Sequence, residues 1–200
     1  MSLEVEEDRI AALRARAHPL RLRMLSLLTG AALSAAELAR ELGVSQALAS
    51  YHLRQLADAQ VVELAEELSR RGGRERRYRY RVRPEAGGRR PVGDAEGWVL
   101  FVEAVIDELR RRSGQRAPDL PGLTIDAELW VPSEEWEHAR MAIAAAGTRL
   151  HEHACRPHEP GTVHINATVA MFAMVEPDAP INSRKAPAAP INSRKAPAAP

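Results

Sequence analysis

Apolar residues in the first third of the chain recur at helical spacing, and residues that cap or break helices separate the apolar runs. Residues 8–17 place their apolar side chains on one helical face. Residues 19–30 begin with Pro19 and are too rich in leucine for a surface helix. We therefore predict an amphipathic first helix, followed by a mostly buried second helix that ends at Gly30.

The next two segments carry the signals of short, capped helices. Ser34 followed by Glu37 is the pattern of a capping box, in which each side chain satisfies the other residue's free backbone N–H. Gly43 ends this helix, and Ser45 caps a further helix that runs to about Ala59. Two short helices joined by a tight glycine turn predict a helix-turn-helix.

A basic hairpin is predicted directly after this unit. Residues 61–64 begin a strand, and the pair Gly72-Gly73 forms a turn. Residues 76–83 then alternate strictly, with arginine at every second position; Tyr78, Tyr80 and Val82 share the other face. A helix-turn-helix followed by such a hairpin predicts a winged helix.

Three further elements are predicted in the second half. Residues 98–112 form a helix with one apolar face and three arginines in its last turn. Residues 123–131 and 163–175 alternate between apolar and polar positions, as half-buried strands do, and a helix capped near Ser133 and ending at Gly147 lies between them. We predict a small strand-helix-strand unit here.

Charge is distributed unevenly along the chain, although the formal net charge is only +1. Ten arginines lie between Arg70 and Arg90, against two acidic residues. Such a local excess of positive charge beside a helix-turn-helix is typical of a surface that binds nucleic acid. The alternative is a solvated charge run, which is the usual explanation of isolated surface charges.

The segment 45–56 is the predicted recognition helix. Its outward face carries small polar residues and one arginine, which suit the major groove of DNA, while the wing arginines suit phosphates or a narrow minor groove. Leu48 is expected to pack against the neighbouring helix, and the alternative is that it covers a thymine methyl group. The alternative for this face is a solvated helix in a protein-interaction module. The predicted DNA-binding residues are Ser45, Gln46, Ala47, Ser50, Tyr51, His52, Arg54, Arg70, Arg71, Arg74, Arg76 and Arg77.

Four motifs together resemble the ArsR-type winged-helix regulators of bacteria: HPLRLRML at 18–25, LSAAELA at 33–39, SQALASYHLRQL at 45–56 and GRERRYR at 73–79. The last is similar to the wing of actinobacterial members. The resemblance covers residues 8–112, about half of the chain. It implies a homodimer on a near-palindromic, inverted-repeat operator, usually a repressor that releases DNA when a ligand or metal binds. The implied dimer interface consists of Ile10, Leu13, Trp98, Val102, Val105, Ile106 and Leu109.

The sensing sites of the metal-responsive members are missing, because the recognition region has no cysteine and residues 98–112 have no histidine. The weaker metal candidates are His151, His153, Cys155 and His158, with His164 nearby. Clustered histidines beside a proline-rich loop are more often exposed to solvent, so we predict no cofactor and no metal. Cys155 has no second cysteine in the chain to resolve it as a redox sensor.

Other function classes receive no support. Nucleotide-binding glycine loops, the HExxH zinc motif and Cys-x-x-Cys pairs are absent, so we expect no enzyme. The chain shows neither a membrane-spanning run nor the apolar core of a secretory signal, and we expect a cytoplasmic protein.

The predicted fold is α+β. Residues 1–92 form a winged helix-turn-helix DNA-binding domain, 93–122 a dimerisation helix and linker, and 123–175 the strand-helix-strand unit. Residues 176–200 contain an identical decapeptide twice and should be disordered. We expect a homodimeric DNA-binding repressor whose C-terminal unit responds to a small-molecule effector or extends the dimer. The alternatives are a protein-interaction module on the same scaffold and a metal-responsive sensor that uses the histidine and cysteine cluster.

Overall fold

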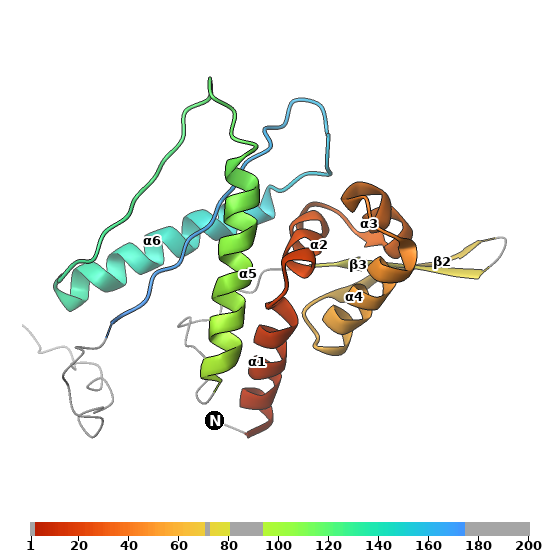
Figure 1. Ribbon diagram of the computed structural model, residues 1–200, viewed down its shortest axis with the longest axis horizontal. Coiled ribbons are helices and arrows are strands. Elements are labelled where there is room, and N and C mark those ends of the chain that lie inside the picture. The colour runs from red at the N-terminus through yellow and green to blue at the C-terminus, as the bar shows by residue number, and fades with distance from the viewer. Residues whose placement is uncertain (1–2, 71–72, 81–93, 175–200) are drawn as a thin grey trace, which may run out of the picture. The chain divides into compact units, whose positions relative to one another are not determined.

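The computed structural model describes residues 3–70, 73–80 and 94–174. The predictions for Arg71, Gly72, residues 81–93 and the repeated tail lie outside these residues. The elements, shown in Figure 1, are α1 (Leu3–Arg16), α2 (Pro19–Gly30), β1 (Leu33–Ser34), α3 (Ala35–Leu42), α4 (Gln46–Asp58), β2 (Glu63–Arg70), β3 (Gly73–Arg79), α5 (Ala95–Ser113) and α6 (Ser133–Glu152).

The predicted helix caps are confirmed. Ser34 Oγ accepts a hydrogen bond from the Glu37 backbone N–H, and the Glu37 carboxylate accepts one from the Ser34 backbone N–H at 2.8 Å. Gly43 ends α3 with a φ of +66°, in the left-handed region that favours glycine. Ser45 caps α4 through the backbone N–H of Leu48. The turn between α3 and α4 is therefore specified by local chemistry.

A three-stranded antiparallel sheet in the order β1-β3-β2 completes the wing. β3 pairs with β2 over its whole length, and its last residues pair with the two residues of β1. The sequence analysis did not predict β1, because two residues carry no periodicity. The hairpin of β2 and β3 extends away from the helices (Figure 1).

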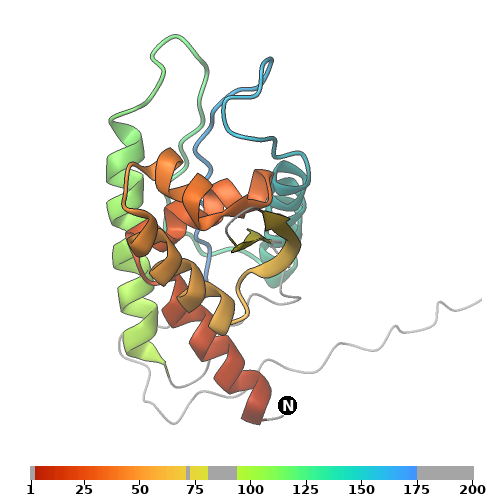
Figure 2. The same ribbon diagram turned by 90° about the vertical axis from the view of Figure 1, so that its right-hand side faces the viewer.

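The hydrophobic core lies among α2, α3, α4 and the base of the sheet (Figure 2). Met24, Leu28, Leu38 and Leu56 are fully buried there. Tyr78 and Tyr80 pack against this core from β3 and the residue after it, as the alternation predicts.

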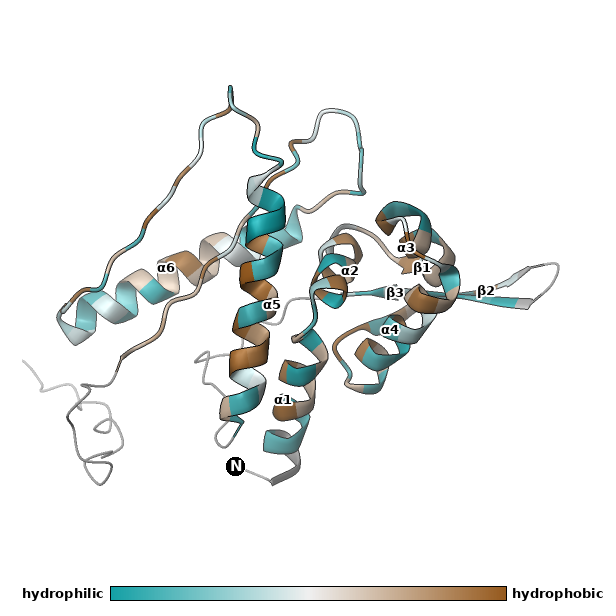
Figure 3. Ribbon diagram, in the orientation of Figure 1, coloured by the Kyte–Doolittle hydropathy of each residue, from teal (hydrophilic) through white to brown (hydrophobic). Residues whose placement is uncertain are grey.

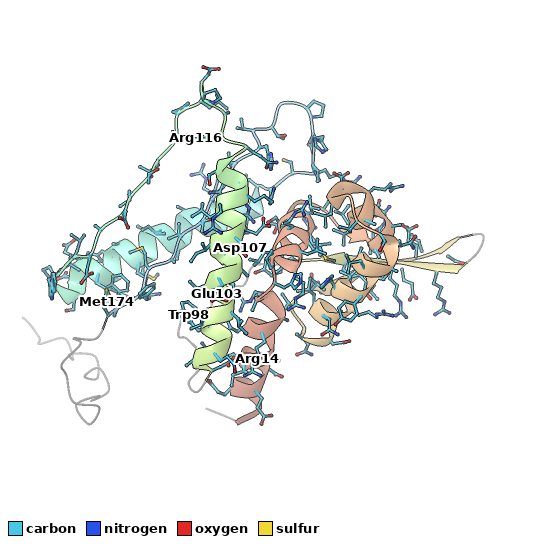
Figure 4. The ribbon with its side chains drawn as sticks, in the orientation of Figure 1. Arg14, Trp98, Glu103, Asp107, Arg116 and Met174 are labelled. Carbon is cyan, nitrogen blue, oxygen red and sulfur yellow. The ribbon has the colours of Figure 1, made fainter. Side chains whose placement is uncertain are left out.

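α1 precedes the helix-turn-helix and α5 follows the wing, and these two helices lie side by side (Figure 1). Asp94 is 3% exposed and caps α5 through the backbone N–H of Gly97. The Arg14 guanidinium on α1 donates to both carboxylate oxygens of Asp94, at 2.9 and 3.1 Å. Figure 4 labels Arg14 and, on α5, Trp98.

The second half of the chain differs from the prediction in two ways. α6 is present but continues through Gly147 to Glu152, because a glycine ends a helix only where it adopts a special conformation and otherwise costs about 1 kcal/mol. The structure assigns no strand to residues 123–131 or 163–168. Alternation determines which side chains share a face, but a strand also needs a paired backbone, and neither segment has one within the described chain.

Residues 169–174 belong to a second compact unit and are considered separately. They are exposed and carry no assigned strand, so the strand-helix-strand unit is not confirmed. Among the described residues, no helix is long and apolar enough to cross a membrane.

Candidate nucleic-acid interface

The recognition helix α4 exposes most of the side chains that the sequence analysis assigned to DNA. Gln46, Ala47, Tyr51 and Arg54 are exposed, as is the cap residue Ser45, and Ser50 is half-buried. The opposite face packs into the core through the fully or almost fully buried residues Ala49, Leu53 and Leu56. α4 is thus anchored along one side and presents an exposed side that is mostly polar.

Leu48 is 41% exposed on the same helix. Of the two predicted roles, the exposure favours an outward one, since packing against a neighbouring helix would bury it more deeply. An exposed leucine among small polar residues suits contact with the methyl group of a thymine.

The wing contributes two exposed arginines near the base of the hairpin loop. The side chains of Arg74 and Arg76 are 77% and 57% exposed. Both lie near the Glu67 carboxylate on β2, at 3.6 and 3.3 Å. Ion pairs this exposed contribute little stability, so both guanidinium groups can exchange this partner for a phosphate.

An open groove of about 390 Å³ separates α4 from the wing. Ser50 and Arg54 line its α4 side, and Arg74, Arg76 and the acidic Glu75 line its wing side. Hydroxyl and guanidinium donors thus line the groove from both sides, together with one carboxylate. Such a surface can bind the backbone of a nucleic acid while the exposed end of α4 reaches the bases.

His52 was predicted to contact DNA, and the structure corrects this. It is 6% exposed, and its ring packs against His18 with the ring centres 4.6 Å apart. His18 caps α2, with its Nδ1 accepting from the backbone N–H of Leu20. Burial, together with the nearby charge of Arg21, lowers the pKa of both histidines below the usual value. The His52 ring therefore packs inside the protein and is not presented on the exposed side of α4.

Arg77 was also assigned to DNA, and the structure turns it inward. Its side chain is only 16% exposed, and its Nη2 donates to the Glu37 carboxylate at 2.6 Å. A second carboxylate, that of Glu75, lies 3.6 Å from its Nε. The alternation along β3 does not reveal this, because the pairing partner comes from α3. Glu37 was visible in the sequence only as the acidic member of the capping box, which gave no signal of a partner on the wing.

The side chains predicted to form a dimer interface divide into three groups by exposure. Leu13 is 4% exposed because α1 packs within the same chain, so it is not available to a partner. Ile106 and Leu109 on α5 are 46% and 43% exposed. Ile10, Trp98, Val102 and Val105 are half-buried. Figure 3 shows the apolar residues of α5 as brown segments along the helix.

The histidine and cysteine cluster does not assemble as a metal site in the described residues, where no group of three or more such ligands comes together. The rings of His151 and His153 each lie within hydrogen-bond distance of a carbonyl oxygen in the preceding turn of α6. His158 lies 3.4 Å from the Glu41 carboxylate, and Cys155 is exposed.

Comparison with known families agrees with this geometry. Residues 17–65 match a family model described as a helix-turn-helix domain. No curated protein matches the chain. The matched stretch extends from the residues before α2 through α4 to the start of β2. The chain therefore contains a helix-turn-helix domain, which indicates a DNA-binding regulator of transcription.

Proposed function

We propose that this protein is a homodimeric, sequence-specific DNA-binding repressor of the ArsR type, which acts by binding and not by catalysis. The observation that carries the proposal is the exposed polar side of α4 facing the same groove as Arg74 and Arg76 of the wing. α4 enters the major groove, and the wing follows the phosphates beside it.

The residues divide by task. Gln46, Ala47 and Tyr51 are exposed on α4 and read base edges, with Ser50 beside them. Arg54, one to two turns further along α4, contacts a phosphate. Each well-formed base contact contributes about 1–3 kcal/mol of discrimination, whereas phosphate contacts add affinity for any sequence.

The dimer is proposed from the uncovered apolar residues of α5. Val99, Ile106 and Leu109 are between 43% and 54% exposed on a helix whose other side packs on α1 and α2. A two-fold axis beside α5 gives two recognition helices, and so predicts an inverted-repeat operator. Residues 123–174, attached to this helix, are the proposed place for an effector or for further dimer contacts.

The test is selection of genomic DNA fragments by the purified protein, followed by titration of the enriched fragment at several salt concentrations. An enriched inverted repeat supports the proposal. Gln46→Ala should relax the sequence preference, whereas Arg76→Gln should weaken binding to all sequences and reduce the salt slope by about 0.9. The absence of any enriched sequence, combined with recovery of a specific partner protein, would favour the protein-interaction module instead.

A further inference from the structure

We propose that Glu37 and Arg77 form a positioning pair that fixes the wing relative to the recognition helix, and that neither side chain contacts DNA. The inference rests on the proposed function, because it concerns how the DNA-binding surface is held together. It assigns to Arg77 a role different from that of its neighbours Arg74 and Arg76.

The first observation is that both oxygens of one carboxylate are used. Glu37 Oε2 accepts the backbone N–H of Ser34 at 2.8 Å, which completes the cap of α3. Its Oε1 accepts from Arg77 Nη2 at 2.6 Å. A single side chain thus caps the N-terminus of α3 and binds a strand of the wing. The bond to Arg77 is charge-assisted and short, so it is stronger than a neutral hydrogen bond.

The second observation is the register of the sheet. Ser34 lies opposite Arg77 in the antiparallel pair of β1 and β3, so backbone and side-chain contacts join α3 and the wing at the same point. Ser34 is 4% exposed. α3 packs in turn against α4. A continuous series of contacts therefore leads from Arg77 through Glu37 and α3 to the recognition helix.

The third observation is the contrast in exposure along β3. The side chain of Arg77 is 16% exposed and that of Glu37 is 20% exposed, whereas Arg74 and Arg76 are 77% and 57% exposed. A phosphate ligand has to be reachable from solvent. Arg77 is largely enclosed by its own protein, and so it is poorly placed for this task.

Glu37 is a negative charge near a surface that is proposed to bind the negatively charged DNA. Burial alone would raise its pKa, but the hydrogen bonds from Ser34 and the charges of Arg77 and Arg40 outweigh burial and lower the pKa below its usual value. Glu37 therefore stays anionic near a surface that binds a polyanion. If it had no positioning role, its neutralisation would strengthen DNA binding through simple electrostatics.

The experiment compares Glu37→Gln, Arg77→Gln, the double variant and Arg76→Gln in full-length protein. DNA affinity is measured across a range of salt concentrations.

Glutamine at position 37 keeps an oxygen that caps α3 but cannot form an ion pair. We expect Glu37→Gln to weaken binding roughly tenfold with an unchanged salt slope, since geometry and not a phosphate contact is lost. Arg77→Gln should behave alike, and the double variant should be no worse than Arg77→Gln. Arg76→Gln should lower the slope by about 0.9.

Amide hydrogen exchange of β1 and β3 supplies a readout that does not depend on DNA. Exchange should accelerate in Glu37→Gln and Arg77→Gln but not in Arg76→Gln, because only the first two release the wing from α3. If exchange of β1 and β3 were unaltered in Glu37→Gln and Arg77→Gln, the proposal that this pair fixes the wing would be overturned, whether or not the protein binds DNA. Equal or tighter DNA binding by Glu37→Gln, or a slope reduced in Arg77→Gln as in Arg76→Gln, would overturn the positioning role. Failure of the wild-type protein to bind any DNA would instead refute the proposed function, and exchange alone would then decide whether the pair fixes the wing.

Discussion

The winged helix and the segment 115–168 both have regularly spaced apolar residues, yet only the winged helix forms a hydrophobic core. Residues 13–62 contain nearly all of the buried apolar side chains. In contrast, α6 has no buried residue, and Leu123, Ile125 and Leu129 are between 72% and 85% exposed. Amphipathic patterning is therefore sufficient for a core only when the elements also pack on one another: α2, α3, α4 and the sheet enclose a common core, whereas α6 and its flanking segments do not.

Substitutions in the core of the winged helix should destabilise the protein far more than substitutions in residues 123–131. Leu56→Ala should lower the free energy of unfolding by about 2–5 kcal/mol, because it opens a cavity in the core. The matched variant Leu129→Ala should change it by no more than about 0.5 kcal/mol. Chemical denaturation measures both. An equal loss in Leu129→Ala would mean that a second copy or another partner buries this segment in solution, and the loss should then depend on protein concentration.

The second prediction concerns the junction between α1 and α5. Asp94→Ala removes the cap of α5 and the partner of Arg14, and loss of the cap alone should cost about 1 kcal/mol of unfolding free energy. Asp94→Asn keeps an acceptor for the Gly97 N–H, and should fall between the wild type and Asp94→Ala. Thermal unfolding of the three proteins checks the order. If Asp94→Asn lost as much as Asp94→Ala, the charge and not the cap would dominate this junction.

The third prediction is a pH dependence confined to the winged helix. The folded pKa of His18 and His52 lies below the value of an unfolded histidine, so the folded state binds fewer protons. Stability is therefore complete above the unfolded pKa of about 6.5 and decreases as the pH falls through it. Unfolding free energies at pH 7.5 and pH 5.5 should differ less in His52→Gln than in the wild type. His138→Gln, on the exposed side of α6, is the control and should leave the difference unchanged.

The smallest expected effect is a gain in helix stability at Gly147, which lies within α6. A Cβ added at Gly147 in α6 meets no atom within 4 Å. Gly147→Ala should therefore stabilise α6 by up to about 1 kcal/mol through helix propensity alone. Circular dichroism should show more helix, while the unfolding transition of the winged helix stays where it is. A matching shift of that transition would show that α6 and the core unfold together.

The helices of the winged helix could be predicted from the sequence because their caps involve residues close together in the chain. The capping box of Ser34 and Glu37, the cap at Ser45 and the left-handed Gly43 each involve residues within a few positions of one another, and the structure confirms all three. The exposed face of α4 followed in the same way, because helical spacing alone separates Gln46 and Tyr51 from the buried Leu53. The sequence by itself thus determined the order of the helices and most of the candidate DNA-binding surface.

Which polar residues of that surface are exposed depends on contacts between elements that are distant in the sequence. His52 and Arg77 occupy positions that local patterning assigns to DNA, but both contact residues within the protein: His52 packs against His18, the cap residue of α2, and Arg77 pairs with Glu37 on α3. Tertiary structure also left residues 123–131 without a paired strand, although their alternation is regular. The physical reason is common to all three cases: caps and helical faces depend on neighbours in sequence, whereas ion pairs, ring contacts and strand pairing depend on neighbours in space.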